Sequence, residues 1–152
     1  MVMISKRWKA IEGKVAKYFD AMRIPLSGIN SRHGTSSDTD HPHFYIEIKH
    51  GKTWGFLREF PISQPSNNWW VMYDDVLCVP LFQWLTIYKD HEEGIVVPQR
   101  PSMRLKKLFN DTEGKARQEG KIMAITVIHP HGFDIGDSFC FLKRLDNKID
   151  NN

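Results

Sequence analysis

Glu47 and Lys49 are the residues whose types and spacing point most directly to chemistry. They lie two positions apart in FYIEIK, residues 44–49, where apolar side chains occupy every second position. This period of two predicts a β-strand on which both charged side chains leave the same face. A carboxylate can hold a hard divalent cation, and an adjacent ammonium can stabilise an attacking water and the charge that builds on a phosphate. Phosphodiester hydrolysis needs both groups, although an exposed strand with alternating charges has the same pattern.

Two aspartates precede this strand, in SSDTDHPH. Aspartate is common in turns, which is the simpler interpretation of Asp38 and Asp40. If their segment pairs antiparallel with the strand around Pro42-His43, however, Asp38 lies opposite Glu47, with Cβ atoms about 4.5–5.5 Å apart. Two carboxylates at that separation repel each other unless a cation lies between them. A register shift of two residues exchanges the aspartates, so the sequence leaves the choice between them open.

A third carboxylate, Glu12, falls within the apolar stripe of an expected helix. Residues 5–22 have apolar side chains at spacings of three and four, with Ser5 as a candidate N-cap and Pro25 limiting continuation. A carboxylate that faces a core is unfavourable unless it is paired or bound to a metal. The alternative is an edge position in which Glu12 leans towards Lys9 on the solvent side.

The rest of the chain predicts alternating strands and helices. After a loop over 27–41 that ends in a short strand, we expect a hairpin of residues 69–73 and 76–80, a short helix over 81–89, and a turn bracketed by Pro98 and Pro101. A helix capped by Ser102 is expected over 102–119, ending at Gly120. Strands are expected over 121–128 and 138–145, with a turn at 130–137 between them.

The composition allows one soluble domain with a mildly basic surface. The 152 residues are the size of a single domain, and 41% of them are hydrophobic. No apolar run approaches the ~18 residues of a membrane span, and the N-terminus lacks the apolar stretch of a secretory signal. The two cysteines fit neither a disulfide framework nor a zinc pattern, which favours a reducing cytoplasm. A formal charge of +3 is compatible with nucleic-acid binding without requiring it.

The order of Glu12 in WKAIEGKVAKYF, Asp38, and then Glu47 and Lys49 resembles the PD-(D/E)XK nuclease superfamily. Within it, the chain is similar to the Holliday junction resolvases of archaea and phages. The later GKARQEGKIMAITVI is also similar to that family, in which a helix leads through Gly-Lys into the next strand. Unlike the name-giving motif, the chain has no proline before either aspartate.

The resemblance covers residues 5–50 and 102–145, within a single nuclease domain over 1–152. Residues 51–101 do not align and are expected to be an insertion. The fold it implies is α/β and restriction-endonuclease-like: an αβββαβ core with a mixed central sheet flanked by helices. DNA resolvases of this type are homodimers, because a four-way junction needs two symmetric cuts. A bacterial, archaeal or phage-infected cell would be the setting.

The resemblance also implies a ligand set for Mg²⁺, for which Mn²⁺ can substitute. Asp38, Glu47 and the Ile48 carbonyl would bind this ion. Glu12 would hold a second ion or a metal-bound water, and Lys49 would orient or activate the attacking water. Two alternatives remain: a restriction-like or nicking endonuclease of the same fold, and a DNA-binding module that does not cut. The intact set of four residues argues against the second, since a decayed site usually loses a ligand.

Other residues with chemical potential have simpler interpretations. The His-Pro-His sequences at 41–43 and 129–131 could together supply four zinc ligands, but each proline favours a turn. Residues 69–70, both tryptophan, could stack on unpaired bases and are more often core residues. Arg32 and His33 precede the metal-site aspartate and could contact the phosphate backbone of DNA.

Overall fold

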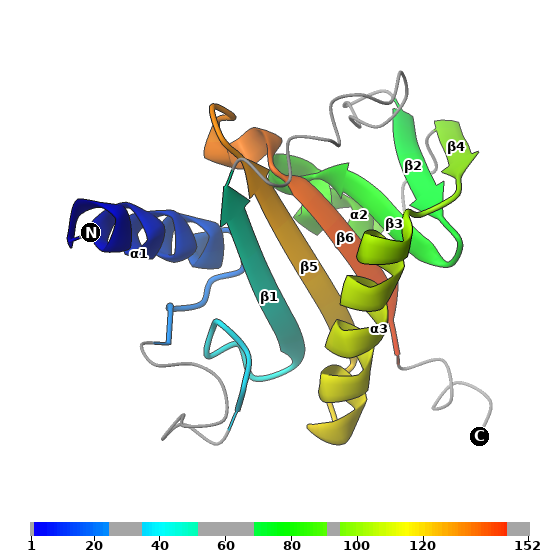
Figure 1. The fold of residues 1–152 in the computed structure, drawn as a ribbon. Coiled ribbons are helices and arrows are strands. Elements are labelled where there is room, and N and C mark those ends of the chain that lie inside the picture. Colours follow the sequence, from blue (N-terminus) through cyan, green and yellow to red (C-terminus); the bar gives the residue numbers. More distant parts are fainter. Residues whose placement is uncertain (1, 25–34, 52–68, 91–94, 146–152) are drawn as a thin grey trace.

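A six-stranded mixed sheet with helices on both faces forms the centre of the molecule (Figure 1). The computed structural model describes residues 2–24, 35–51, 69–90 and 95–145. The strands are β1 Phe44–Gly51, β2 Trp69–Tyr73, β3 Val76–Pro80, β4 Ile95–Gln99, β5 Met123–Pro130 and β6 Phe139–Arg144. The helices are α1 Val2–Lys17, α2 Trp84–Asp90 and α3 Met103–Gln118, with 3₁₀ turns η2 Leu81–Gln83 and η3 Ile135–Asp137.

The strand order across the sheet is β1-β5-β6-β3-β2-β4. β1 pairs parallel with β5, β2 pairs parallel with β4, and the remaining neighbours are antiparallel. α3 leads from β4, at one edge of the sheet, back to β5, which lies next to β1 at the other edge. β5 can therefore run parallel to β1, because a parallel pair requires such a crossover. The α/β class with a mixed sheet and flanking helices is therefore confirmed.

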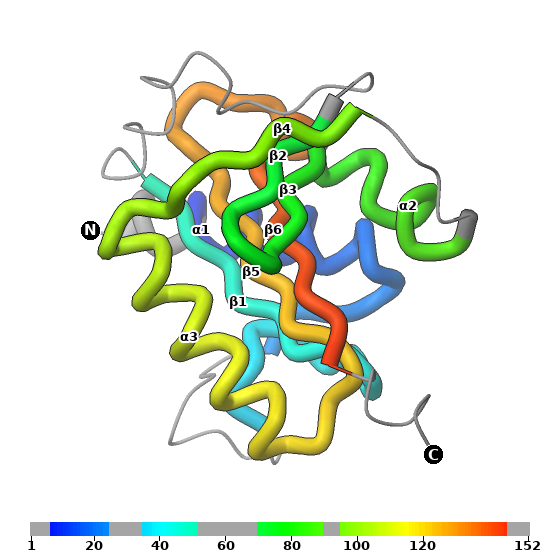
Figure 2. The backbone as a smooth tube through the Cα atoms, turned by 90° about the vertical axis from the view of Figure 1, so that its right-hand side faces the viewer, coloured from blue at the N-terminus to red at the C-terminus, as the bar shows by residue number. Residues whose placement is uncertain are grey.

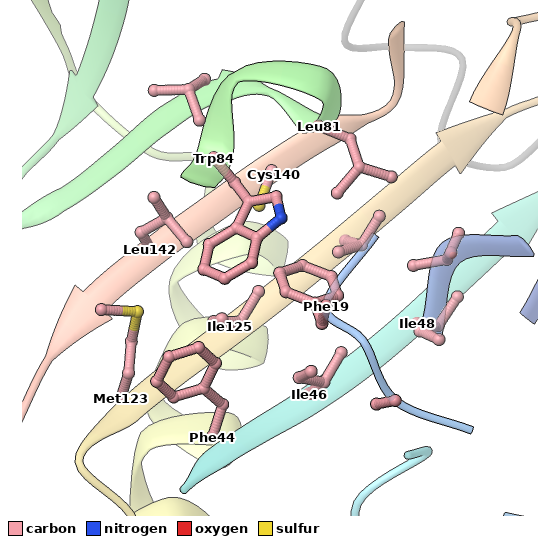
Figure 3. Close-up of a cluster of buried hydrophobic side chains, with 14 of the residues drawn as sticks. Phe19, Phe44, Ile46, Ile48, Leu81, Trp84, Met123, Ile125, Cys140 and Leu142 are labelled. Atoms are coloured by element: carbon pink, nitrogen blue, oxygen red, sulfur yellow. The ribbon is translucent and has the colours of Figure 1, made fainter. Parts of the chain in front are cut away.

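One face of the sheet carries the larger core, against α1 and α2 (Figure 3). Ile46 and Ile48 of β1 point to this face and are almost fully buried, as the period of two predicts. Phe19 packs against Trp84 at a ring-centroid distance of 4.6 Å. α1 and α2 cover this face, and their side chains exclude water from the apolar residues of the strands.

The opposite face is covered by α3, which lies across from α2 on the other side of the strands (Figure 2). Phe109 of α3 packs on Tyr73 and Phe141 of the sheet. Ser102 caps the helix, since its side chain accepts a hydrogen bond from the Leu105 amide. The cap predicted from sequence is thus confirmed, and it fixes where α3 begins.

The hairpin of β2 and β3 is also confirmed, with Asp74 at its turn in the left-handed region at φ 55°. Three other local predictions were wrong. α1 begins at Val2, so Ser5 lies within the helix and is not its N-cap. α1 ends at Lys17 rather than at 22, because the chain turns through Asp20 at φ 53°, and Met22 is 72% exposed. Pro98 belongs to a strand rather than a turn. β4 is the last strand in the order of the described sheet, and an edge strand tolerates a proline.

The segment predicted as an insertion supplies half of the sheet. Of residues 51–101, the described parts form β2, β3 and β4 on the side away from β1, while 52–68 and 91–94 lie outside the described residues. None of the described helices is long and apolar enough to span a membrane.

Candidate active site

The free edge of β1 is covered by the segment 37–40, which satisfies the backbone groups of the strand. The Asp38 amide donates to the Ile46 carbonyl at 2.9 Å. The Ser37 hydroxyl accepts from the Ile46 amide and donates to the Ile46 carbonyl, both at 3.0 Å. A side chain here replaces part of a strand ladder, so the regular antiparallel pairing predicted for 37–41 does not form.

The Asp38 carboxylate continues this covering of the edge. Asp38 is buried, and one of its oxygens accepts a hydrogen bond from the Ile48 amide at 2.7 Å. The N–H and C=O of one strand residue point the same way, so the Ile48 carbonyl also points to this edge. Asp40, in contrast, is exposed and accepts from the Met22 amide at 2.8 Å. The structure therefore brings Asp38 to β1 and directs Asp40 away.

Glu47 leaves the face of β1 that α3 covers, and its carboxyl group shares a hydrogen bond with Asp38. Burial, and next the neighbouring negative charge of Asp38, raise the pKa of Glu47 to about 7. Lys49 opposes this shift, with its Nζ 3.5 Å from a Glu47 oxygen. Two carboxyl groups in contact thus lie beside one ammonium group.

Glu12 reaches the same place from α1, on the other face of the sheet. It is 5% exposed, which excludes the solvent-side position near Lys9. The Arg23 Nε donates to Glu12 at 2.8 Å. Burial and then the charge of Asp38 raise the pKa of Glu12, while Arg23 acts in the opposite direction. Glu12 and Glu47 therefore approach Asp38 from the two faces of the sheet.

Three residues that support the site were missed from sequence. Arg23 neutralises Glu12, and Lys115 of α3 lowers the pKa of Glu47 through its positive charge, after the larger effect of Lys49. Glu119 accepts from the Thr35 hydroxyl and from the Ser36 amide at 2.9 Å, which holds the segment just before Asp38. No local pattern marks these residues, because each acts on a partner far away in the chain.

The zinc hypothesis is wrong for the described residues. The His41 Nδ1 accepts from the His43 and Phe44 amides, as in a turn. The Nδ1 of His129 lies 2.8 Å from that of His50, and its Nε2 lies 2.6 Å from the Phe133 carbonyl. Because β1 and β5 run parallel, the two His-Pro-His sequences lie at opposite ends of the sheet.

The two remaining sequence candidates for DNA contact have different outcomes. Trp70 is a core residue, 5% exposed, and its Nε1 donates to Gln83 at 3.2 Å. Arg32 and His33 lie outside the described residues. Contact with DNA therefore stays a prediction for these two residues.

Within residues 2–24, 35–51, 69–90 and 95–145, no three His, Cys, Asp or Glu side chains are arranged as a ready metal site. Glu12, Asp38 and Glu47 converge, but Arg23 takes one of the Glu12 oxygens. No protein-family model, curated protein or solved structure gives a significant match to this chain. The chemistry of the site therefore has to be argued from its own residues.

Proposed function

We propose that the chain is a metal-dependent DNA endonuclease whose catalytic residues are Asp38, Glu47 and Lys49. The observation that carries the proposal is the contact between the Asp38 and Glu47 carboxyl groups with the Lys49 ammonium beside them. Two partly buried carboxylates in contact are unfavourable in a protein that only needs stability. Such an arrangement is common where a group must change its charge during function.

The donor set fits one hard cation. Asp38, Glu47 and the Ile48 carbonyl offer oxygen ligands at one edge of the sheet, which suits Mg²⁺ or Mn²⁺, with water completing the coordination. A cation there would relieve the repulsion that raises the pKa of Glu47. We assign no second cation to Glu12, because Arg23 already balances its charge.

Other residues of the chain position the metal ligands and contribute to the proposed reaction. The Ile48 amide holds the Asp38 carboxylate in place, and Glu119 holds the segment before it. Lys49 is 37% exposed at its side chain, so its ammonium is accessible to a phosphate while it stays near Glu47. It is suited to orient the attacking water and to stabilise the charge that grows on the phosphate.

The order of elements supports a restriction-endonuclease-like fold. Residues 22–24, 37–40 and β1 lie side by side: the Arg23–Thr39 bridge links the first two, and the Asp38 amide links the second to β1. If these two bridged segments are counted as short strands and β2 to β4 are set aside as an insertion, α1 before them and α3 and β5 after them complete the order αβββαβ. The resemblance to Holliday junction resolvases makes a homodimer that cuts four-way junctions the most specific form of the proposal.

A DNA-binding module that does not cut is the second candidate. Arg23 on Glu12 and Lys49 on Glu47 balance two carboxylates without any metal, which a non-catalytic descendant of such a site would also show. The two candidates differ in one measurable property, which is cleavage that requires metal.

The test compares a synthetic four-way junction with a linear duplex that has the same arms. We expect cutting in Mg²⁺ or Mn²⁺, none in excess chelator, and binding without cutting in Ca²⁺. Full activity in chelator would contradict the metal site. Equal cutting of both substrates would favour the restriction-like or nicking alternative, and binding without cutting in every metal would favour the second candidate. Sedimentation at micromolar concentration tests the dimer.

A further inference from the structure

The positive charge of the chain is concentrated on its first helix. α1, residues 2–17, contains five lysine or arginine residues and one acid, which gives this segment a net charge of +4. The whole chain has 21 basic and 18 acidic residues, for a net charge of +3. The rest of the chain therefore has 16 basic against 17 acidic residues, a net charge of −1. Without α1, the protein would not be basic.

The cations of α1 lie on the side of the helix that faces solvent. Four of them are exposed: Arg7, Lys9, Lys14 and Lys17. None of these four forms an ion pair within the part of the chain that the structure describes. The single acid of the helix, Glu12, is buried and bonded to Arg23. α1 thus presents four positive charges to solvent with no exposed carboxylate of its own between them.

α3 is the second basic helix, and its cations are placed differently. It contains five basic residues and two acids. Arg117 forms an ion pair with Glu113 at 2.8 Å, and the charge of Lys115 acts on Glu47. The positive charge of α3 is therefore partly balanced by carboxylates, whereas that of the exposed side of α1 is not.

The apolar side of α1 is already covered by the protein. Ile11 and Val15 belong to the larger core, and Ala16 is fully buried. A helix that binds a membrane surface inserts its apolar side into the lipid, which this helix cannot do while it is packed on the core. A partner of α1 must therefore be held by charge, which is how proteins bind the phosphate backbone of nucleic acids.

The length and position of the cationic surface fit a DNA strand beside the candidate active site. Arg7 to Lys17 is about 15 Å along the helix, and one strand of B-DNA places roughly four phosphates along that length. α1 extends outward from the β1 side of the sheet (Figure 1). Glu12 of the same helix lies close enough to Asp38 for the charge of Asp38 to raise its pKa. DNA held along α1 would therefore lie next to the candidate catalytic residues.

We infer that the exposed side of α1 binds the phosphate backbone of double-stranded DNA, whatever its base sequence. The four exposed cations hold the DNA beside the site and take no part in cleavage. That the bound polyanion is DNA rests on the proposed nuclease function, whereas the concentration of positive charge on α1 does not.

The test measures binding of the full chain to a fluorescently labelled linear duplex, by anisotropy in chelator over a range of salt concentrations. Lys14→Gln combined with Lys17→Gln should weaken binding roughly 10- to 50-fold at about 0.1 M salt. The slope of log K against log salt should become shallower by about 1.8, because each phosphate contact contributes about 0.9. The loss should be the same for a duplex of unrelated sequence and for a four-way junction, since phosphate contacts carry no sequence information.

Two further variants serve as controls. Lys106→Gln combined with Lys107→Gln removes the same charge from exposed positions of α3, and should leave affinity within about twofold and the salt slope unchanged. Lys14→Arg combined with Lys17→Arg keeps the charge of α1 and should keep both the affinity and the slope. Thermal unfolding establishes that all three proteins are folded.

The inference is overturned if the α1 variant binds as well as the wild type, or if the α3 variant loses as much affinity, since binding would then follow net charge alone. It is also overturned if the wild type binds no duplex. Vesicles that contain phosphatidylserine are the second probe in that case: binding that depends on Lys14 and Lys17 would assign the surface to a membrane.

Cleavage in Mg²⁺ is measured separately, so the two proposals can fail independently. A wild type that binds DNA through α1 but cuts in no metal would contradict the nuclease proposal alone. A wild type that cuts, with an α1 variant that binds normally, would contradict only the inference about α1.

Discussion

At the β1 edge of the sheet, side chains provide the hydrogen bonds that another strand would make, whereas the β4 edge carries exposed apolar residues. Ser37 and Asp38 bind the backbone of β1. On β4, Ile95 and Val96 are 68% and 43% exposed, and Pro98 has no amide to offer a further strand. The first edge is closed by hydrogen bonds from residues 37 and 38, whereas the second contains a proline.

This difference shows that the residues around the β1 edge are held in place more firmly than those around the β4 edge. Buried carboxylates repel each other, so a site that holds them together needs surrounding contacts that leave them little freedom. Arg23, Glu119 and the Ile48 amide supply such contacts at the β1 edge. Because no comparable set of polar contacts is found at β4 among the described residues, substitutions at the two edges should have very different effects.

The largest effect is expected for Lys49→Ala in the proposed cleavage reaction. A group that acts on charge developing in the transition state contributes more to rate than to affinity. Single-turnover cleavage in Mg²⁺ should fall by about 10²–10³, while junction binding in Ca²⁺ stays within about tenfold. Lys107→Ala, at an exposed position of α3, is the matched control. If Lys49→Ala cuts at a near wild-type rate, Lys49 is only a solvated strand residue.

The next comparison is between the two aspartates. Asp38 contacts Glu47 and the Ile48 amide, whereas Asp40 is exposed and its carboxylate accepts a hydrogen bond from the Met22 amide. Asp38→Asn should therefore reduce cleavage about tenfold or more beyond Asp40→Asn. Both variants can be compared by single-turnover cleavage at saturating Mg²⁺, with thermal unfolding as the folding control. A dead Asp40→Asn with an active Asp38→Asn would reverse the assignment.

The stability of the metal-free protein should depend on pH through Glu47. Its pKa is raised from 4.5 to about 7 in the folded state, so the folded state holds more protons between these values. The stabilisation is complete below pH 4.5 and is lost as pH rises through 7. Between pH 5 and pH 8 in chelator, the wild type should lose on the order of 2 kcal/mol that Glu47→Gln does not lose.

Urea unfolding of both proteins at the two pH values measures this difference. Asp40→Asn is the control for a general change in charge near the site. Parallel pH dependence of Glu47→Gln and the wild type would mean that neither burial nor the contact with Asp38 raises the pKa of Glu47. Added Mg²⁺ should stabilise the wild type more at pH 8 than at pH 5, because the ion competes with the proton.

The smallest effect is expected at the other edge. Ile95→Thr changes an exposed side chain on β4, so the free energy of unfolding should change by less than about 0.5 kcal/mol. Cleavage in Mg²⁺ should be unchanged. Ser37→Ala provides the contrast, since it removes the hydroxyl that binds both backbone groups of Ile46. A larger loss of stability from Ile95→Thr than from Ser37→Ala would contradict the distinction between the edges.

Much of the secondary structure could be predicted because it depends on neighbours in the sequence. The alternation in FYIEIK gave β1, Asp74 lies at the turn of the hairpin, and Ser102 caps α3. The prediction was wrong at the end of α1, where the apolar spacing continues through Met22 although the chain turns at Asp20. It was also wrong at Pro98, because an edge strand tolerates a residue that a central strand excludes.

The candidate site was only partly predictable. That Glu12 faces inward follows from the helical period, and that Glu47 and Lys49 share a face follows from the strand period. Which of the two aspartates lies beside Glu47 depended on the register of their segment against β1. That register is set by Ser37 and Asp38, whose side chains bind the β1 backbone in place of a regular ladder.

By itself, the sequence determined the elements and the direction of their side chains, because backbone hydrogen bonding imposes periods of 3.6 and 2 on any helix or strand. Only the tertiary structure decided which charges meet. Arg23 with Glu12 and Lys115 with Glu47 each depend on packing between different elements of the fold. Periodicity constrains neighbours, whereas contacts across the sheet are set by how the two faces and the β1 edge are covered.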